Sequence, residues 1–246
     1  FHDGITGCFL SNELVDAFPV HVLRVDQGKV QEVYVASVDD QFMGTLGPLS
    51  TPALTTYLDT LAAQDIQLTD GATLEVNLQA LGWMKSVGHL LKQGLVLTID
   101  YGHTAQDLYG PERYKGTLLC YHQHKVSENP FVRVGLQDIT SHVNFSALAQ
   151  AGLDAGLELT GFTNQMSFLT GLGVEQLLSA LDPESREFHT ALQLLHPRGM
   201  GTTFKVLIQH KGMPMPALDG LRFKAFFEAS LLPGSVTNGA QSVGVA

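Results

Sequence analysis

Positively charged residues are scarce in this sequence. Its 14 lysines and arginines stand against 24 aspartates and glutamates, which gives a formal net charge of -10 at pH 7. Nucleic acids and anionic membrane surfaces are bound through basic patches, so this balance disfavours both as partners. Cysteine is equally rare, with only Cys8 and Cys120, each inside an apolar run. Two such thiols favour buried free cysteines over a disulfide or a zinc site.

Long apolar runs are missing too. No stretch is apolar enough to cross a membrane as a helix, so we expect no membrane span. What the chain does have is a hydrophobic share of 44% over 246 residues, which is ample for a packed core. This length fits one large domain or two small ones. No internal repeat or break in composition divides the sequence.

Polar residues follow the first apolar run directly. Residues 8–10 are apolar and predict a buried strand, and Asn12, Glu13 and Asp16 come just after it. Pro19 then prevents a regular helix. In open α/β sheets, ligands bind just beyond the carboxyl ends of the strands. The sequence therefore predicts a polar site near its start.

A second predicted strand ends in the same way. The apolar stripe over 74–92 predicts a helix that Gly94 closes as a C-cap. Residues 95–100 are apolar and β-branched, as in a strand buried on both faces, and the strand ends in Asp100, followed by tyrosine and glycine. Parallel strands would bring both polar ends to one crevice. The simpler alternative is that these polar residues only cap local helices and turns.

The remaining pattern alternates strands and helices, as in an α/β fold. Residues 101–143 are polar, glycine-rich and aromatic, too long for an ordinary connection, and we expect an inserted lid there. Residues 233–246 predict a flexible tail. The other expected elements are a hairpin over 20–25 and 30–36, helices over 53–63, 145–155, 165–181 and 185–195, strands over 157–162 and 203–210, and a mixed segment over 221–232.

Two other motifs suggest chemistry but are incomplete. His122 and His124 are spaced to share one side of a strand, yet no third ligand stands at a recognisable spacing, so we expect no metal. Asp138, Ser141 and His142 supply the parts of a hydrolytic triad. The sequence has no Gly-x-Ser-x-Gly elbow to present a nucleophile, so a hydrolase is a remote alternative.

Five segments between about 11 and 210 point together to one family. They are Asn12-Glu13-Leu14-x-Asp16-Ala17-x-Pro19-Val20-His21, Ile99-Asp100-Tyr101-Gly102, Gly116-Thr117-Leu118-x-Cys120-Tyr121-x-x-His124, Asp138-Ile139-Thr140-x-His142-Val143-x-Phe145 and Gln165-x-x-Phe168-Leu169-x-x-Leu172-Gly173. In this order they resemble the MidA-type class I S-adenosylmethionine-dependent methyltransferases, a family that includes mitochondrial complex I assembly factors that methylate an arginine.

The resemblance implies an α/β fold with a Rossmann-like class I methyltransferase sheet, of which residues 1–232 would hold strands four to seven of seven, with extra helices and the lid. It implies S-adenosylmethionine as cofactor and transfer of a methyl group to a protein arginine. A respiratory-complex subunit would be the substrate, and a homodimer is a further expectation. The compartment would be the bacterial cytoplasm or, in a eukaryote, the mitochondrial matrix.

The resemblance also assigns roles to site residues. A guanidinium stays protonated and is a poor nucleophile, and carboxylates can hold its fork and absorb developing charge. Glu13 is the first choice for this work. The expected catalytic residues are Glu13, Asn12, Asp16 and Asp100, and the expected lining residues are Tyr101, Gly102, Asp138, Thr140 and His142.

The sequence departs from the family in one respect. The family's glycine-rich cofactor loop follows its first strand, and residues 2–7 are too short to supply both. We therefore expect the main cofactor loop to lie outside this chain, the strand at 8–10 to keep an open apolar edge, and the isolated chain to bind the cofactor poorly. The alternative function is a non-catalytic protein-binding or assembly module that keeps the fold.

Overall fold

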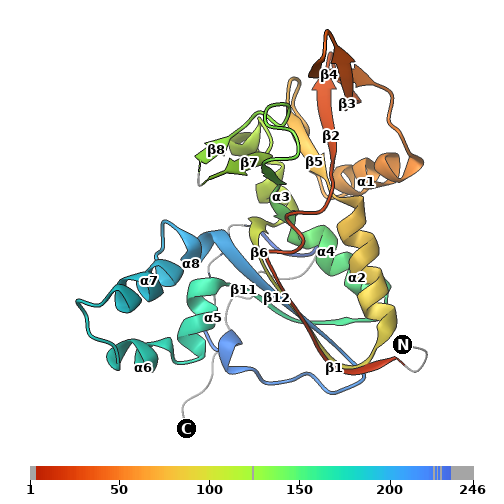
Figure 1. Ribbon diagram of the computed structural model, residues 1–246. Coiled ribbons are helices and arrows are strands. Elements are labelled where there is room, and N and C mark those ends of the chain that lie inside the picture. Colours follow the sequence, from red (N-terminus) through yellow and green to blue (C-terminus); the bar gives the residue numbers. More distant parts are fainter. Residues whose placement is uncertain (1–3, 124, 224, 226, 228, 234–246) are drawn as a thin grey trace.

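The central layer of the molecule is a mixed sheet. The computed structural model describes residues 4–123, 125–223, 225, 227 and 229–233 (Figure 1). The strand order is β1 (Ile5–Asn12), β6 (Leu91–His103), β12 (Phe204–Lys211) and β11 (Glu158–Asn164), and the short β10 (Val143–Asn144) also pairs with β6. β1 runs parallel to β6, whereas β12 is antiparallel to both β6 and β11. The predicted α/β sheet is confirmed, and β1, β6 and β11 end at the same edge.

Two groups of helices pack against this sheet. α2 (Leu78–Leu90) and α4 (Phe145–Asp154) lie together on one face, where Met84, Phe145, Leu148 and Leu207 are buried in a shared core. A further group of helices lies beside the β11 end of the sheet (Figure 1). They are α5 (Gln165–Gly171), α6 (Val174–Ser179), α7 (Arg186–Leu195) and α8 (Met200–Thr203).

Two smaller sheets lie above the carboxyl edge of the main sheet (Figure 1). The first is antiparallel, in the order β4 (Gln41–Gly47), β3 (Lys29–Val38), β2 (His21–Asp26) and β5 (Thr73–Val76), and α1 (Pro52–Ala62) closes its core. The second consists of β8 (Lys125–Ser127), β7 (Leu119–His122) and β9 (Asp138–Thr140). Short helical segments complete the chain: α3 (Ala105–Leu108), η1 (Pro111–Arg113) and η2 (Asp219–Leu221).

A chain of hydrogen bonds joins the first small sheet to the main sheet. The Asn144 side-chain amide donates to the Tyr57 hydroxyl over 2.7 Å, and the hydroxyls of Tyr57 and Tyr109 are 2.8 Å apart. Tyr109 in turn donates to the backbone carbonyl of Glu75 over 3.0 Å. Because Tyr57 is on α1, Glu75 on β5 and Asn144 at the start of α4, these bonds fix three elements together.

Several expected boundaries were wrong. The helix predicted over 74–92 begins only at Leu78, because 73–76 form β5 and pair with β2. Gly94 does not cap that helix: it lies within β6 opposite Gly7, where a Cβ would come within 1.8 Å of the Gly7 carbonyl oxygen. The helix predicted over 165–181 is broken at Gly173, whose φ of +83° is a left-handed conformation that favours glycine.

The strand at 8–10 is more exposed than predicted. Cys8 is exposed, unlike the buried Cys120, and Leu10 is 69% exposed. Side chains alternate between the two faces of a strand, so Phe9 packs into the α2 core while Cys8 and Leu10 point to the opposite face. No described residue covers β1 on that face. The predicted tail, 233–246, lies outside the described residues except for Pro233, and His124 lies outside them too.

Candidate functional site

The two predicted polar strand ends lie side by side. Asn12 is opposite Ile99 in the β1–β6 pairing, and the Glu13 backbone N–H donates to the Ile99 carbonyl over 3.0 Å, which extends the pairing by one residue. Glu13 then turns the chain with a φ of +48°, a left-handed conformation that is uncommon for a residue other than glycine. The turn leaves the Asn12 and Glu13 side chains exposed at the strand end, with their polar atoms 3.4 Å apart.

Asp16, Asp100 and Tyr101 form a buried polar cluster beneath this turn. Asp100 is fully buried, and its Oδ2 accepts from the backbone N–H groups of Val15 over 3.0 Å and Asp16 over 3.3 Å. Its Oδ1 accepts from the Tyr101 N–H over 2.9 Å. The Tyr101 hydroxyl donates to Asp16 Oδ2, and Asp16 Oδ1 is buried without a hydrogen-bond partner among the described residues. We call Asp16, Asp100 and Tyr101 the acidic cluster.

Burial dominates the electrostatics of the acidic cluster. Burial and the nearby Asp16 carboxylate raise the pKa of Asp100 to about 7, against the three backbone N–H donors that lower it. Burial and the hydrogen bond to Asp16 also raise the pKa of Tyr101 well above its usual value. The tyrosine is therefore a neutral donor at neutral pH, and Asp100 is poised between its charged and neutral forms.

A pair of histidines lies against the acidic cluster. The ring of His142 packs edge-on against Tyr101, with centroids 5.4 Å apart, and is stacked with the ring of His103 at 5.1 Å. Arg113 Nε donates to His103 Nε2 over 3.1 Å, so that nitrogen carries no proton. The 3.1 Å contact between His142 Nδ1 and His103 Nε2 therefore has His142 as its donor. Burial, followed by the Arg113 charge, lowers the pKa of His103 to about 3 and that of His142 to about 4.

The other expected lining residues divide into two groups. Gly102 and His142 lie at the acidic cluster: a Cβ at Gly102 would come within 2.2 Å of the Val143 carbonyl oxygen, and the His142 N–H donates to Thr117 Oγ1 over 3.0 Å. Thr140 is half-buried at the end of β9, and its side chain hydrogen-bonds to Tyr101. By contrast, Asp138 is exposed at the start of β9, where it is opposite Tyr121 rather than in the acidic cluster.

Sequence reasoning included His103 in the Asp100-Tyr101-Gly102-His103 candidate site without giving it a role, and it missed two cationic residues at this edge, Arg113 and Lys205. Lys205 is opposite Asp100 in the β6–β12 pairing, more than one hundred residues away in the chain. Arg113 ends η1 in an irregular segment with no periodic pattern. Only His103 had a local signal, since it directly follows the Asp100-Tyr101-Gly102 strand end.

The donor set suits a cationic ligand better than a metal or a phosphate. Among the described residues, no group of three or more histidines, cysteines or acids is placed to hold a metal ion. The exposed Glu13 carboxylate and the buried acids behind it favour a positive charge, such as a sulfonium or a guanidinium. None of the described strands is followed by a glycine-rich loop that could hold the nucleoside part of a cofactor. These residues therefore fit only the sulfonium end of S-adenosylmethionine.

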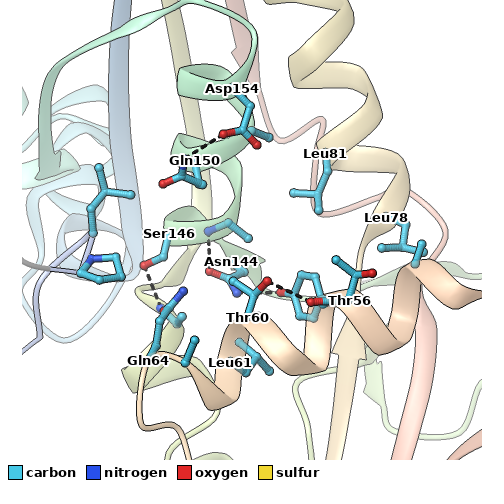
Figure 2. A pocket seen from close by; sticks show the side chains of 18 of the residues that line it. Thr56, Thr60, Leu61, Gln64, Leu78, Leu81, Asn144, Ser146, Gln150 and Asp154 are labelled. Carbon is cyan, nitrogen blue, oxygen red and sulfur yellow. Dashed lines mark hydrogen bonds between the residues drawn. The ribbon is translucent and has the colours of Figure 1, made fainter.

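An apolar cavity of about 770 Å³ lies between α1, α2 and α4, away from the acidic cluster. Figure 2 shows Leu61, Leu78 and Leu81 lining it, with Gln150 and Asp154 hydrogen-bonded to each other on the α4 wall at 2.9 Å. Its lining includes neither Glu13 nor a member of the acidic cluster. None of the helices that the structure describes is both long and apolar enough to cross a membrane.

Comparison with known proteins points to one family. A family model described as an S-adenosyl-L-methionine-dependent methyltransferase matches residues 1–163. The chain is 30% identical over 228 residues to the Drosophila melanogaster mitochondrial protein arginine methyltransferase NDUFAF7 homolog, with 85% of this chain and 48% of the relative covered. It is also 30% identical over 205 residues to the Danio rerio mitochondrial protein arginine methyltransferase NDUFAF7, covering 80% and 46%. The chain thus spans about half the length of the curated relatives it matches.

Solved structures agree with the sequence comparison. A Burkholderia thailandensis protein whose crystal structure contains S-adenosyl-homocysteine superposes with a TM-score of 0.81 at 32% sequence identity. The match covers 89% of this chain and 57% of that chain. A native crystal structure from the same organism gives a TM-score of 0.80, also at 32% identity, and covers 88% and 58%. The β1–β6–β12–β11 sheet therefore has the fold of these proteins.

Proposed function

The chain belongs to the family of S-adenosyl-L-methionine-dependent methyltransferases, and from this premise we propose that it forms the methyl-acceptor side of a protein arginine methyltransferase. The observation that carries the proposal is the exposed Glu13 carboxylate in the turn after β1, whose following residues Val15 and Asp16 donate to the buried Asp100. Ligands bind at this edge in open α/β sheets. A guanidinium is a ligand that such a set of acids would attract.

The proposed mechanism gives each acid a separate task. Glu13 and Asn12 hold the fork of the substrate guanidinium through charge-assisted hydrogen bonds, which orients one nitrogen toward the methyl group. Asp16, which the Tyr101 hydroxyl holds in place, adds negative charge behind it, and Asp100 adds to that charge in its ionised form. S-adenosylmethionine, when bound, would supply the methyl group, and its sulfur would keep the electron pair of the sulfur–carbon bond that breaks. Glu13 would accept the proton that the substrate nitrogen loses.

We propose a covering role for the segment over 101–143. Its β7–β8–β9 sheet lies next to the carboxyl edge of β6, and it delivers Thr140 and His142 to the acidic cluster. A cover of this kind would exclude water from the reacting nitrogen. Asp138 is exposed at the far end of β9, and we propose for it a place on the rim, in contact with the substrate protein.

The substrate and location follow from the relatives as proposals. The Drosophila and Danio relatives are named as mitochondrial protein arginine methyltransferases. For a eukaryotic source we propose the mitochondrial matrix and a respiratory-complex subunit as substrate, and for a bacterial source the cytoplasm. We also propose that the active protein is a homodimer, which sedimentation of the purified protein would test.

The first test is the Glu13→Gln variant. We expect methyl transfer to a protein arginine to fall by at least about a hundredfold, because the amide keeps the shape but not the charge or the proton acceptor. Formation of S-adenosyl-homocysteine and mass spectrometry of the substrate protein measure this loss, in the protein that carries the full family domain. Circular dichroism should show an unchanged fold, since Glu13 is exposed.

A matched control separates the charge at the site from charge in general. Glu184→Gln removes one exposed carboxylate in the turn before α7, far along the chain from the strand ends, and should leave turnover unchanged. Near-normal turnover in Glu13→Gln would refute the assigned role. Wild-type protein that binds the substrate but never forms S-adenosyl-homocysteine would favour the non-catalytic assembly module instead.

A further inference from the structure

A second, polar cavity opens at the same sheet edge as the acidic cluster. Its volume is about 530 Å³. Since β6 and β11 end at this edge and β12 begins there, three neighbouring strands contribute to its wall. Its polar lining comes from His103 at the end of β6, Gln106 and Asp107 in α3, Arg113 in η1, Asn164 at the end of β11, Thr202 in α8 and Lys205 at the start of β12.

Two cations face this cavity without an ionic partner. Lys205 is only 7% exposed, and its amino group donates to the backbone carbonyls of Thr202 and Thr203. Arg113 is half-buried and uses Nε and Nη1 to donate to His103 and to the Asp107 carbonyl. Among the described residues, no carboxylate oxygen comes within 4.0 Å of either cation. Burial, followed by the Arg113 charge, lowers the pKa of Lys205 to about 8.

The acids on the wall form no ion pair with these cations, although the charge of Asp107 partly offsets the effect of burial on the pKa of Lys205. Asp107 Oδ2 accepts the Thr104 hydroxyl at 2.9 Å, and Glu112 is exposed. A buried and a half-buried cation that repel each other and have no ion-paired carboxylate are costly to maintain, and an anion bound between them would relieve that cost. The neutral pair His103 and His142 stands between this cavity and the acidic cluster, so sites of opposite charge share one wall.

We infer that this cavity binds a carboxylate of the substrate protein, from an acidic side chain close to the methyl-accepting arginine. The inference rests on the proposed function, which places the substrate guanidinium at the acidic cluster. An arginine followed by an acidic residue would match the two sites in charge. The planar fork of Arg113, with Nη2 free of described partners, suits a carboxylate, and Lys205 supplies a second donor.

The test measures peptide binding without the methyl donor. Two short capped peptides carry one arginine and, next to it, either a glutamate or a glutamine. Calorimetry with the protein should show about tenfold tighter binding of the glutamate peptide, the effect expected of one charge-assisted hydrogen-bonded pair. Arg113→Gln and Lys205→Met should each remove this preference. Equal binding of the two peptides by the wild-type protein would overturn the inference.

Matched variants and a second readout complete the design. Arg133→Gln and Lys125→Met each remove one exposed cation outside the cavity and should keep the preference. If Lys205→Met fails to fold, Arg113→Gln alone decides, because that side chain is half-buried. In methylation assays Arg113→Gln should raise KM for the glutamate peptide and leave kcat nearly unchanged. A preserved glutamate preference in a protein that never methylates would overturn the proposed function but not the carboxylate site.

Discussion

At the scale of single residues, the site holds two carboxyl groups in a buried environment, where charges of the same sign are most unfavourable. Asp16 and Asp100 are both buried, and three backbone N–H groups are directed at Asp100. A carboxylate in this setting is stabilised by its donors and destabilised by burial and by its neighbour. Such opposing effects are common where a protein has been shaped for a charged ligand rather than for stability alone.

The raised pKa of Asp100 predicts a specific pH dependence of stability. With a folded-state pKa of about 7 against 3.8 for the free group, the folded protein holds the extra proton between these values. The stability that Asp100 contributes is therefore fully present below about pH 4 and is lost as the pH rises through 7. We expect the free energy of unfolding of wild type, relative to Asp100→Asn, to fall by roughly 1–3 kcal/mol between pH 5 and 8.

Urea unfolding of both proteins at a series of pH values measures this difference. The comparison with Asp100→Asn is needed because His103 and His142 act in the opposite direction. Their lowered pKa values make stability fall as the pH drops below about 6.5, in both proteins alike. Parallel stability curves for wild type and variant would show that Asp100 keeps its charge throughout this range.

At the scale of secondary structure, β6 organises the site. It pairs with β1, β10 and β12, and its last four residues are Asp100, Tyr101, Gly102 and His103. Asp100 and Gly102 are buried on one face of the strand, and Tyr101 and His103 lie on the other. Alternation along one strand thus places the Asp100 carboxylate at the turn after β1, and it places the rings of Tyr101 and His103 against His142.

Gly102→Ala should disrupt this strand end. The added Cβ would lie 2.2 Å from the Val143 carbonyl oxygen and 2.7 Å from its nitrogen, so β10 would have to move. We expect a loss of about 1–3 kcal/mol in the free energy of unfolding, as for other overpacked sites. Gly82→Ala is the matched control: Gly82 is exposed within α2, and its Cβ would meet nothing within 4 Å. It should stabilise the protein by about 0.5–1 kcal/mol, and a similar effect at both positions would contradict the argument.

How far the sequence predicts these elements depends on the range of the contacts that define them. The polar residues at the end of β1 and the acid Asp100 near the end of β6 were predicted because a short apolar run followed by acids is a local signal, although β6 continues to His103. β5 was missed because Leu74 stands four residues before Leu78 and so fits the helical stripe as well as a strand, and pairing with β2, about 50 residues away, decides between them. Lys205 was missed at the site for the same reason, since its register opposite Asp100 is set by sheet formation alone.

At the scale of the whole molecule, one face of the main sheet differs from the other. α2 and α4 bury the face that carries Phe9 and Val96. On the opposite face Cys8 and Leu10 are exposed, and neighbouring Leu97 on β6 is only half-buried. Adjacent apolar side chains on an edge strand are a site for association between molecules.

Leu10→Lys should therefore reduce self-association of the 246-residue chain. A charge on this face opposes contact between two copies, and the side chain is already 69% exposed, so the fold should tolerate it. Light scattering over a concentration series measures the effect. Leu177→Lys on α6 makes the same substitution at 72% exposure and should change association little. Equal effects of the two substitutions would mean that the chain does not self-associate through the β1 face.

The hydrogen bonds from Asn144 through Tyr57 and Tyr109 to the Glu75 carbonyl have a direction. A carbonyl oxygen can only accept, so the Tyr109 hydroxyl donates its hydrogen to Glu75. Tyr57 must therefore donate to Tyr109, and it accepts from Asn144. Each tyrosine hydroxyl thus donates one hydrogen bond and accepts another. A side chain that can only donate, or only accept, cannot replace either hydroxyl. Replacing either tyrosine with phenylalanine would leave a neighbouring polar group without its hydrogen-bond partner, which would weaken the junction between the first small sheet and the main sheet.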